Sequence, residues 1–141
     1  MPDFTLRPAV PDDIPAVLEL WRTAAEGTSI TDDPAGLARL LEHDPEALIV
    51  AQAGGRIVGT VVAAWDGWRG HLYRLAVDPA SRRRGIGSAL VAAAEARLET
   101  AGGRRVDALV LDDNAAGRVM WTHAGYDPET QWTRWTKSFT G

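Results

Sequence analysis

The pattern of apolar and polar positions changes period several times along the chain, and these changes predict the order of its elements. Apolar residues recur at helical spacing in four stretches, and run continuously or alternate with polar residues in six others. The predicted strands cover residues 4–7, 47–53, 57–65, 71–77, 106–111 and 132–139, and the predicted helices 11–27, 34–43, 85–101 and 114–124. This order, β-α-α-β-β-β-α-β-α-β, predicts an α/β protein with a mixed sheet covered by helices.

The first predicted helix carries an apolar stripe that ends in a glycine. Its apolar positions are Ile14, Val17, Leu18, Trp21 and Ala25. We expect Trp21 to lie in the core, with a place beside a pocket as the alternative. Gly27 is expected to stop this helix, because glycine commonly ends helices in the left-handed conformation.

Three consecutive strands are predicted to form an antiparallel meander that leads into a glycine-rich loop. Gly54-Gly55 is a hairpin signal, and Asp66-Gly67 marks the next turn. After the strand at 71–77 come an Asp-Pro turn, three arginines (Arg82, Arg83 and Arg84), Gly85-Ile86-Gly87 and a long helix.

This loop has the composition of a site for phosphate or pyrophosphate. Glycines allow a sharp turn in which successive backbone N–H groups point into one concavity. The following helix adds unpaired N–H groups and the positive end of its dipole. The alternative is an ordinary strand-to-helix connection with solvated arginines, because short glycine motifs occur by chance.

Composition narrows the possible classes of function. A chain of 141 residues is expected to form a single domain over 1–141. Its net charge of −4 argues against a nucleic-acid partner. It has no cysteine, its three histidines lie far apart, and no apolar run reaches the roughly 18 residues of a membrane span. We therefore expect no metal site and no membrane partner, and, with no signal-peptide pattern, a cytoplasmic protein.

Four segments in order resemble the GCN5-related N-acetyltransferases (GNAT enzymes), and residues 65–70 resemble those of small bacterial members. Residues 82–87 fit the acetyl-CoA loop of that family, 75–79 the strand before it, 114–116 the start of the next helix and 125–126 the Gly-Phe/Tyr that follows. The order of the elements agrees over nearly the whole chain. The resemblance implies the acyl-CoA N-acyltransferase fold, in which the central strands splay apart.

The resemblance also implies acetyl-CoA as cosubstrate and a set of residues that would hold it. Backbone N–H groups around residues 83–88 would bind its pyrophosphate, and the exposed strand edge at Leu75 and Val77 would pair with the pantetheine arm. The residues implied in cosubstrate binding are Leu75, Ala76, Val77, Arg82, Arg83, Arg84, Gly85, Ile86, Gly87, Ser88, Asn114 and Trp121.

Helical spacing assigns the two faces of the helix at 114–124. Asn114, Gly117 and Trp121 share one face, which we expect to point towards the cosubstrate. The opposite face is the expected core stripe and consists of Ala116, Val119, Met120 and His123.

The chain departs from the family at the positions that often carry acid or base groups. Trp121 stands where many members have a tyrosine acid, and Leu109 and His71 stand where some have a glutamate. His71 and Tyr73 are therefore the predicted catalytic residues, with Asp107 as a third candidate. The alternatives are a solvated strand end for His71 and a core position for Tyr73.

The predicted function is direct transfer of an acetyl group from acetyl-CoA to a primary amine of a small molecule or peptide. Trp21, Trp65, Trp68 and Trp121 could line an aromatic acceptor pocket, or could serve as core or dimer contacts. One alternative is a catalytically silent CoA-binding sensor. A weaker one is a nucleotide-binding protein, although the chain lacks a P-loop and a GxGxxG motif. A homodimer is a further prediction.

Overall fold

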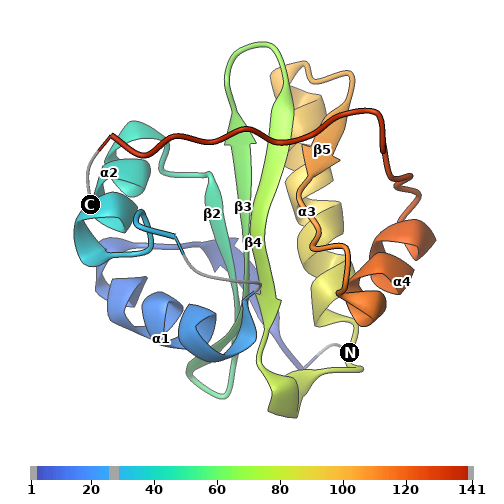
Figure 1. Ribbon diagram of the computed structural model, residues 1–141. Coiled ribbons are helices and arrows are strands. Elements are labelled where there is room, and N and C mark those ends of the chain that lie inside the picture. Colours follow the sequence, from blue (N-terminus) through green and yellow to red (C-terminus); the bar gives the residue numbers. More distant parts are fainter. Residues whose placement is uncertain (1–2, 26–28, 140–141) are drawn as a thin grey trace. The chain divides into compact units, whose positions relative to one another are not determined.

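The computed structural model describes residues 3–25 and 29–139 (Figure 1). The chain divides into two compact units, Met1–Leu109 and Val110–Gly141. The single domain expected from the length stays a prediction.

The first unit is built on a five-stranded mixed sheet. Its strands, in the order β1-β2-β3-β4-β5, are β1 (Thr5–Pro8), β2 (Leu48–Ala53), β3 (Arg56–Trp65), β4 (Gly70–Val77) and β5 (Val106–Ala108). Its helices are α1 (Ile14–Ala24), α2 (Pro34–His43) and α3 (Ile86–Ala101), with short 3₁₀ turns η1 (Pro11–Asp13) and η2 (Pro79–Ser81). The first four strands are antiparallel and β5 runs parallel to β4. The predicted fold class is confirmed.

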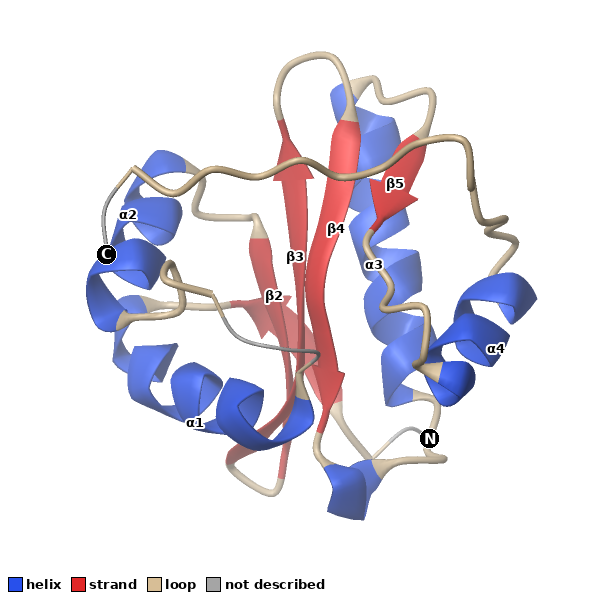
Figure 2. Cartoon of the chain, in the orientation of Figure 1, coloured by secondary structure: helices blue, strands red, loops and turns tan. Residues whose placement is uncertain are grey.

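Neighbouring residues of β3 show that helices cover both faces of the sheet. A Cβ atom on Gly59 would meet Ile86 and Leu90 of α3 at 2.9 and 3.0 Å. The side chain of Thr60, the next residue, bonds to Trp21 of α1. Because successive side chains of a strand point to opposite faces, α3 and α1 lie on opposite sides of β3 (Figure 2).

The core of the first unit confirms the apolar stripes of the sequence. One buried cluster joins α1 and α2 to β2, β3 and β4. Its members include Val17, Leu20, Trp21, Leu37, Leu41, Leu48, Val50, Val62 and Ala76. Trp21 is only 5% exposed, as predicted for a core residue. The stop expected at Gly27 lies outside the described residues.

The second unit contains one short helix, α4 (Ala115–His123), whose start is set by an asparagine cap. The Oδ1 atom of Asn114 accepts a hydrogen bond from the N–H of Gly117 at 3.0 Å. Near the other end, the ring of Trp121 stands edge-on to that of Tyr126, with their centroids 4.9 Å apart. This aromatic contact joins α4 to the segment that follows it.

The stripe predicted as the core of α4 is wrong for three of its four residues. Ala116, Val119 and His123 are exposed, and only Met120 is partly buried. The inward face is instead the one with Trp121, which is 8% exposed. The reason is size: one indole covers more apolar surface than several small side chains, so it decides which face turns inward.

Two predicted strands differ from the structure. The strand expected over 106–111 ends at Ala108, where its ladder with β4 stops. The last strand, expected over 132–139, does not form, and Trp132 and Trp135 are 73% and 91% exposed. β-Rich composition is not sufficient, because a strand needs a neighbouring backbone to pair with.

Gly59 tests the close contact between β3 and α3. Replacing it with Val should lower the free energy of unfolding by about 1–3 kcal/mol, because the new side chain would overlap the first turns of α3. Urea unfolding followed by circular dichroism would measure this. Thr5→Val, which places the same side chain at an exposed position of β1, is the control. An equal effect of both variants would contradict this packing.

Candidate active site

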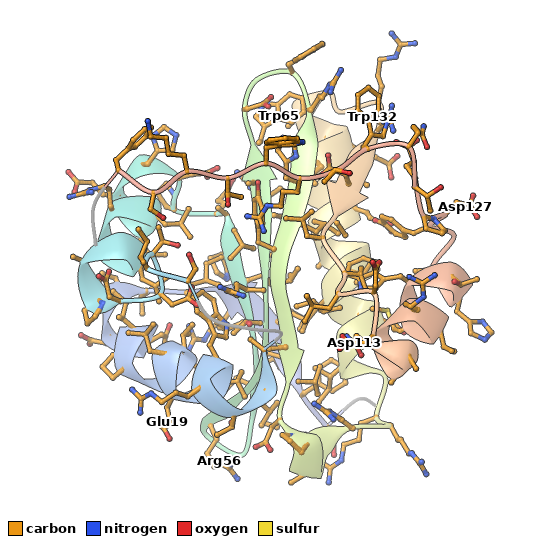
Figure 3. The ribbon with its side chains drawn as sticks, in the orientation of Figure 1. Glu19, Arg56, Trp65, Asp113, Asp127 and Trp132 are labelled. Atoms are coloured by element: carbon orange, nitrogen blue, oxygen red, sulfur yellow. The ribbon has the colours of Figure 1, made fainter. Side chains whose placement is uncertain are left out.

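The glycine-rich loop is attached firmly to the beginning of β3. The N–H of Asp78 donates to the carbonyl of Val58 at 2.8 Å, and the Asp78 carboxylate accepts from the N–H of Ala80 at 3.1 Å. Arg56 pairs with the same carboxylate at 3.1 Å. Figure 3 shows Arg56 at one end of β3 and Trp65 at the other. The loop therefore has a defined position at the Arg56 end of the sheet.

The loop presents a set of backbone donors at the start of α3. Arg83 and Gly85 have φ angles of 67° and 80°, in the left-handed region. The first helical hydrogen bond of α3 runs from Ala89 to the carbonyl of Gly85, so the N–H groups of residues 86–88 have no acceptor within the helix. Left-handed residues followed by free helix donors are the geometry that binds phosphate.

The three arginines have different surroundings. Arg82 donates from Nε to the carbonyl of Val77 at 3.3 Å, which ties the loop to the end of β4. Arg84 pairs with Asp3 at 3.1 Å on the surface. Arg83 has no charged partner among residues 3–25 and 29–139. The loop therefore combines two anchored guanidinium groups with one that a bound anion can recruit.

A β-bulge interrupts β4 just before the loop. Thr60 of β3 pairs with Ala76 of β4, and Val62, two residues on, pairs with Tyr73. One residue of β3 thus lies opposite two of β4. Arg74, the first of those two, has a φ of 52°, which is unusual for a residue with a side chain.

The bulge lies where β5 leaves β4. The ladder between the two strands ends at Leu72 and Ala108, although β4 continues to Val77. The N–H of Asp78 points to β3, so with regular alternation those of Val77 and Leu75 point away from it. This is the splayed edge that the sequence predicts, and it has the form that an extended ligand can pair with.

His71 is held between two carboxylates. Its Nδ1 lies 2.9 Å from Asp107 of β5, and its Nε2 lies 3.2 Å from Asp66 in the turn between β3 and β4. Burial lowers the pKa of His71, but the hydrogen bonds to Asp107 and Asp66 outweigh it and raise the pKa above its usual value. Both ring nitrogens are occupied, so this geometry disfavours His71 as a direct base.

Tyr73 is the other predicted catalytic residue, and it lies beside the bulge. Its ring centroid is 6.2 Å from that of His71, so the two share a face of β4 as the alternation predicts. Tyr73 is 41% exposed and therefore not a core residue. It follows directly after Leu72, where the ladder with β5 ends.

A comparison with known protein families accounts for the loop, the bulged strand and α4 together. The family described as "Acetyltransferase (GNAT) family" matches residues 14–126, which include the loop, the bulged strand and α4. The chain belongs to the GNAT family of acetyltransferases. An acetyltransferase of Pectobacterium atrosepticum is 36% identical over 116 residues, which cover 82% of each chain.

Two solved structures have a similar fold. Ard1 from Thermoplasma volcanium has a TM-score of 0.77 and 26% identity, over 87% of this chain and 82% of that one. The diaminobutyrate acetyltransferase EctA from Paenibacillus lautus, solved with L-2,4-diaminobutyric acid and coenzyme A, has a TM-score of 0.72 and 22% identity. That comparison covers 88% of this chain and 75% of EctA.

Membership in the GNAT family confirms the predicted enzyme class, an acetyl-CoA-dependent N-acetyltransferase. In the described part of the chain, no helix has the length and apolar character needed to cross a membrane. The described residues also contain no cluster of three or more histidine and acidic side chains suited to a metal ion.

The predicted site residues of this GNAT enzyme are divided between the two units. Residues 71–77 and 82–88 form one continuous strand, loop and helix start in the first unit. Asn114 and Trp121 lie in the second unit, and their part in binding stays a prediction.

The aromatic pocket predicted from four tryptophans is not formed by the first unit. Trp21 is buried under the middle of β3. Trp65 and Trp68 instead line a groove of about 560 Å³ at the turn between β3 and β4. A shared acceptor pocket is therefore wrong for Trp21 and this pair, because one is enclosed by the core and the others lie at the strand end.

Sequence reasoning named Asp107 as a third catalytic candidate, but it did not predict the polar contacts that support β4. Asp66 and Asp107 hold His71, while Thr60 and Asp32 hold Arg74. Thr60 had a visible signal, because it is a hydroxyl within the apolar run of residues 57–65. A buried hydroxyl needs a hydrogen-bond partner, although the sequence does not say which one.

The His71 cluster predicts a pH dependence. A histidine whose pKa is raised by folding adds stability below its unfolded-state pKa, near 6.5, and this stability is lost as the pH rises through the folded pKa. The difference in unfolding free energy between the wild type and His71→Gln should therefore shrink from about pH 5.5 to about pH 8.5.

NMR titration gives a second reading of the same cluster. Asp107→Asn should lower the pKa of His71, because the variant removes the stronger of the two bonded carboxylates. Asp12→Asn, at an exposed residue of η1, should leave that pKa unchanged. A His71 pKa at or below its usual value in the wild type would contradict the double ion pair.

Proposed function

We propose that this GNAT enzyme transfers the acetyl group of acetyl-CoA directly to a primary amine of a small molecule or peptide. The observation that carries the proposal is that the free edge of β4 is continuous with the backbone donors at the start of α3. The edge of β4 beyond the bulge leads, within a few residues, into the donor set at the start of α3. One part suits an extended acyl arm and the other suits its pyrophosphate.

The residues of the loop fit coenzyme A in size and charge. The free N–H groups of residues 86–88 and the guanidinium of Arg83 would bind pyrophosphate oxygens. Gly87 leaves space beside them, because a Cβ atom there would only reach Val77 at 3.7 Å. The backbone of Leu75 and Val77 would pair with the amides of the pantetheine arm.

The bulged strand supplies the groups needed next to the thioester. The N–H of Leu75 would donate to the thioester oxygen and stabilise the negative charge that develops there. Attack by the amine forms the C–N bond, and the C–S bond then breaks. The Tyr73 hydroxyl would give its proton to the departing sulfur, the task for which Trp121 is unsuited because an indole N–H does not ionise near neutral pH.

The amine proton would leave through solvent, since no described carboxylate or imidazole is assigned to receive it. His71 would instead hold the start of β4 against β5 through Asp107. His71 serves as a base only if one of its two hydrogen bonds opens. Because no side chain is assigned as the base, the proposed mechanism favours an amine that is already partly unprotonated when it binds.

Support for an amine acceptor comes from the fold neighbour that contains a diamine acid together with coenzyme A. The sequence predicts that the acceptor is either a small molecule or a peptide, and it does not favour one of the two. A silent CoA-binding module is the second candidate, and Trp121 in place of the usual tyrosine favours it. Homodimer formation stays a prediction.

Release of coenzyme A thiol from acetyl-CoA would test this proposal across amines, polyamines, amino acids and peptide N-termini. The protein has no cysteine, so a thiol reagent reports product only. We expect one acceptor class to stimulate repeated turnover. Binding of acetyl-CoA without turnover by any class would favour the silent module instead.

Gly87 offers a matched pair for the loop. Gly87→Glu should weaken acetyl-CoA binding at least about tenfold, because it places a carboxylate among donors for an anion. Gly87→Ala should bind nearly as well as the wild type, since the space for a Cβ atom is present. Isothermal titration calorimetry measures both affinities. Equal affinities for the two variants would refute the loop as the pyrophosphate site.

Tyr73→Phe tests the proton donor. We expect kcat to fall by about 10²-fold, the lower range for general acid catalysis, with little change in the KM for acetyl-CoA. The other tyrosine of the chain provides the control, Tyr126→Phe, which should keep most of its kcat. Unchanged kcat in Tyr73→Phe would remove Tyr73 from the mechanism.

A further inference from the structure

We infer that Asp32, Thr60 and the side chain of Arg74 are positioning residues that hold the bulge of β4 in its active shape. In this inference the three residues do not touch the substrates. They act by fixing the direction in which the Leu75 N–H points. The inference rests on the proposed function and extends it to groups far apart in the sequence.

The bulge needs support because its backbone is strained. Arg74 has a φ of 52°, and this left-handed conformation is unfavourable for a residue with a Cβ atom. Glycine would adopt it freely. The presence of arginine at this position is therefore informative: the side chain must contribute enough to keep the strand in this shape.

The first support is a buried hydroxyl. Thr60 is completely buried, and its Oγ1 donates to the carbonyl of Arg74 at 2.9 Å. The same oxygen accepts from the indole N–H of Trp21 at 2.8 Å. With its proton and one of its lone pairs in hydrogen bonds, the hydroxyl is fixed in orientation. The carbonyl of Arg74 is thereby held on the side of β3.

The second support is an ion pair from the segment before α2. The guanidinium of Arg74 contacts both carboxylate oxygens of Asp32, with Nε at 3.2 Å and Nη2 at 2.7 Å. The two side chains are only 20% and 16% exposed. The Arg74 guanidinium also lies 5.7 Å from the ring centroid of Trp21. Partial burial and the two-point contact make this pair stronger than an ordinary surface ion pair.

These supports determine where the next N–H points. In a trans peptide the C=O and N–H bonds are antiparallel. Because Thr60 holds the Arg74 carbonyl on the β3 side, the Leu75 N–H is directed away from β3, towards the edge that β5 has left. This agrees with the alternation counted back from Asp78. Trp21 of α1, Thr60 of β3 and Asp32 before α2 thus together fix the direction of one backbone donor, the Leu75 N–H.

The test compares kcat with binding in two variants. Asp32→Asn removes the charge of the ion pair, and Thr60→Val removes the hydroxyl but keeps the branched shape. Each should lower kcat by about tenfold or more, since a misplaced oxyanion donor costs up to 10²–10³-fold. The affinity for acetyl-CoA, measured by calorimetry, should fall by a smaller factor than kcat, because the loop that binds pyrophosphate is untouched and only the Leu75 part of the binding edge is altered.

Asp13→Asn is the matched control. Asp13 forms a comparable two-point pair with Arg7, at 2.7 and 3.0 Å, and is 13% exposed, but that pair lies away from β4. This variant should lose stability in urea unfolding and keep its kcat. A kcat loss equal to that of Asp32→Asn would show general destabilisation and would overturn the inference.

Arg74→Gly provides a rescue. Glycine adopts the left-handed conformation without help, so Asp32→Asn should have little further effect on kcat in an Arg74→Gly background. Full additivity of the two substitutions would contradict the assigned role, since the ion pair is already absent in Arg74→Gly and Asp32 would then have to act through a group other than Arg74.

A measurement without turnover separates this inference from the proposed function. The amide resonance of Leu75 in ¹⁵N–¹H NMR spectra of the free protein should shift in Asp32→Asn and Thr60→Val, and not in Asp13→Asn. An unshifted Leu75 amide in all three would overturn the positioning role. Failure of the wild type to bind acetyl-CoA would refute the proposed function alone, because the Leu75 resonance reports the bulge in either case.

Discussion

The hydrogen bond from Thr60 to the carbonyl of Arg74 is the interaction on which the site depends. It joins a fully buried residue of β3 to the single strained residue of β4. Beside that bulge, β4 and β5 part after Leu72. Two regular parallel strands would use all their edge donors on each other. The separation of β5 from β4 leaves the last part of β4 with an unpaired edge, next to helices that cover both faces of the sheet at β3.

The same strand connects this edge to the anion site. Val77 ends β4, accepts a hydrogen bond from Arg82 and precedes the turn that is tied to β3 through Asp78. The loop then enters α3 with free N–H groups. A ligand with an extended amide arm and a pyrophosphate could therefore be recognised largely by backbone atoms. Recognition of this kind would depend little on the identity of the side chains in the loop.

His71 illustrates how environment changes the interpretation of a residue. In the sequence it is a histidine near the candidate site, with a usual pKa suited to proton transfer. In the structure Asp66 and Asp107 occupy both of its nitrogens and raise its pKa. The group that suits a base by type is therefore suited by geometry to an ion-pair clamp between the start of β4 and β5.

The sequence alone determined the features that depend on local chemistry. Periodicity placed the strands of the meander, α3 and the buried Trp21, and the spacing of arginines and glycines located the loop that we propose binds pyrophosphate. It also led to wrong predictions wherever the answer depends on distant partners. The strand at 132–139 lacks a pairing backbone, and the inward face of α4 follows Trp121 and Tyr126 rather than the smaller apolar residues. Only the tertiary structure brought Asp32, Thr60 and Arg74 together, because a bulge and its supports are defined by register and by contacts between segments that no local pattern encodes.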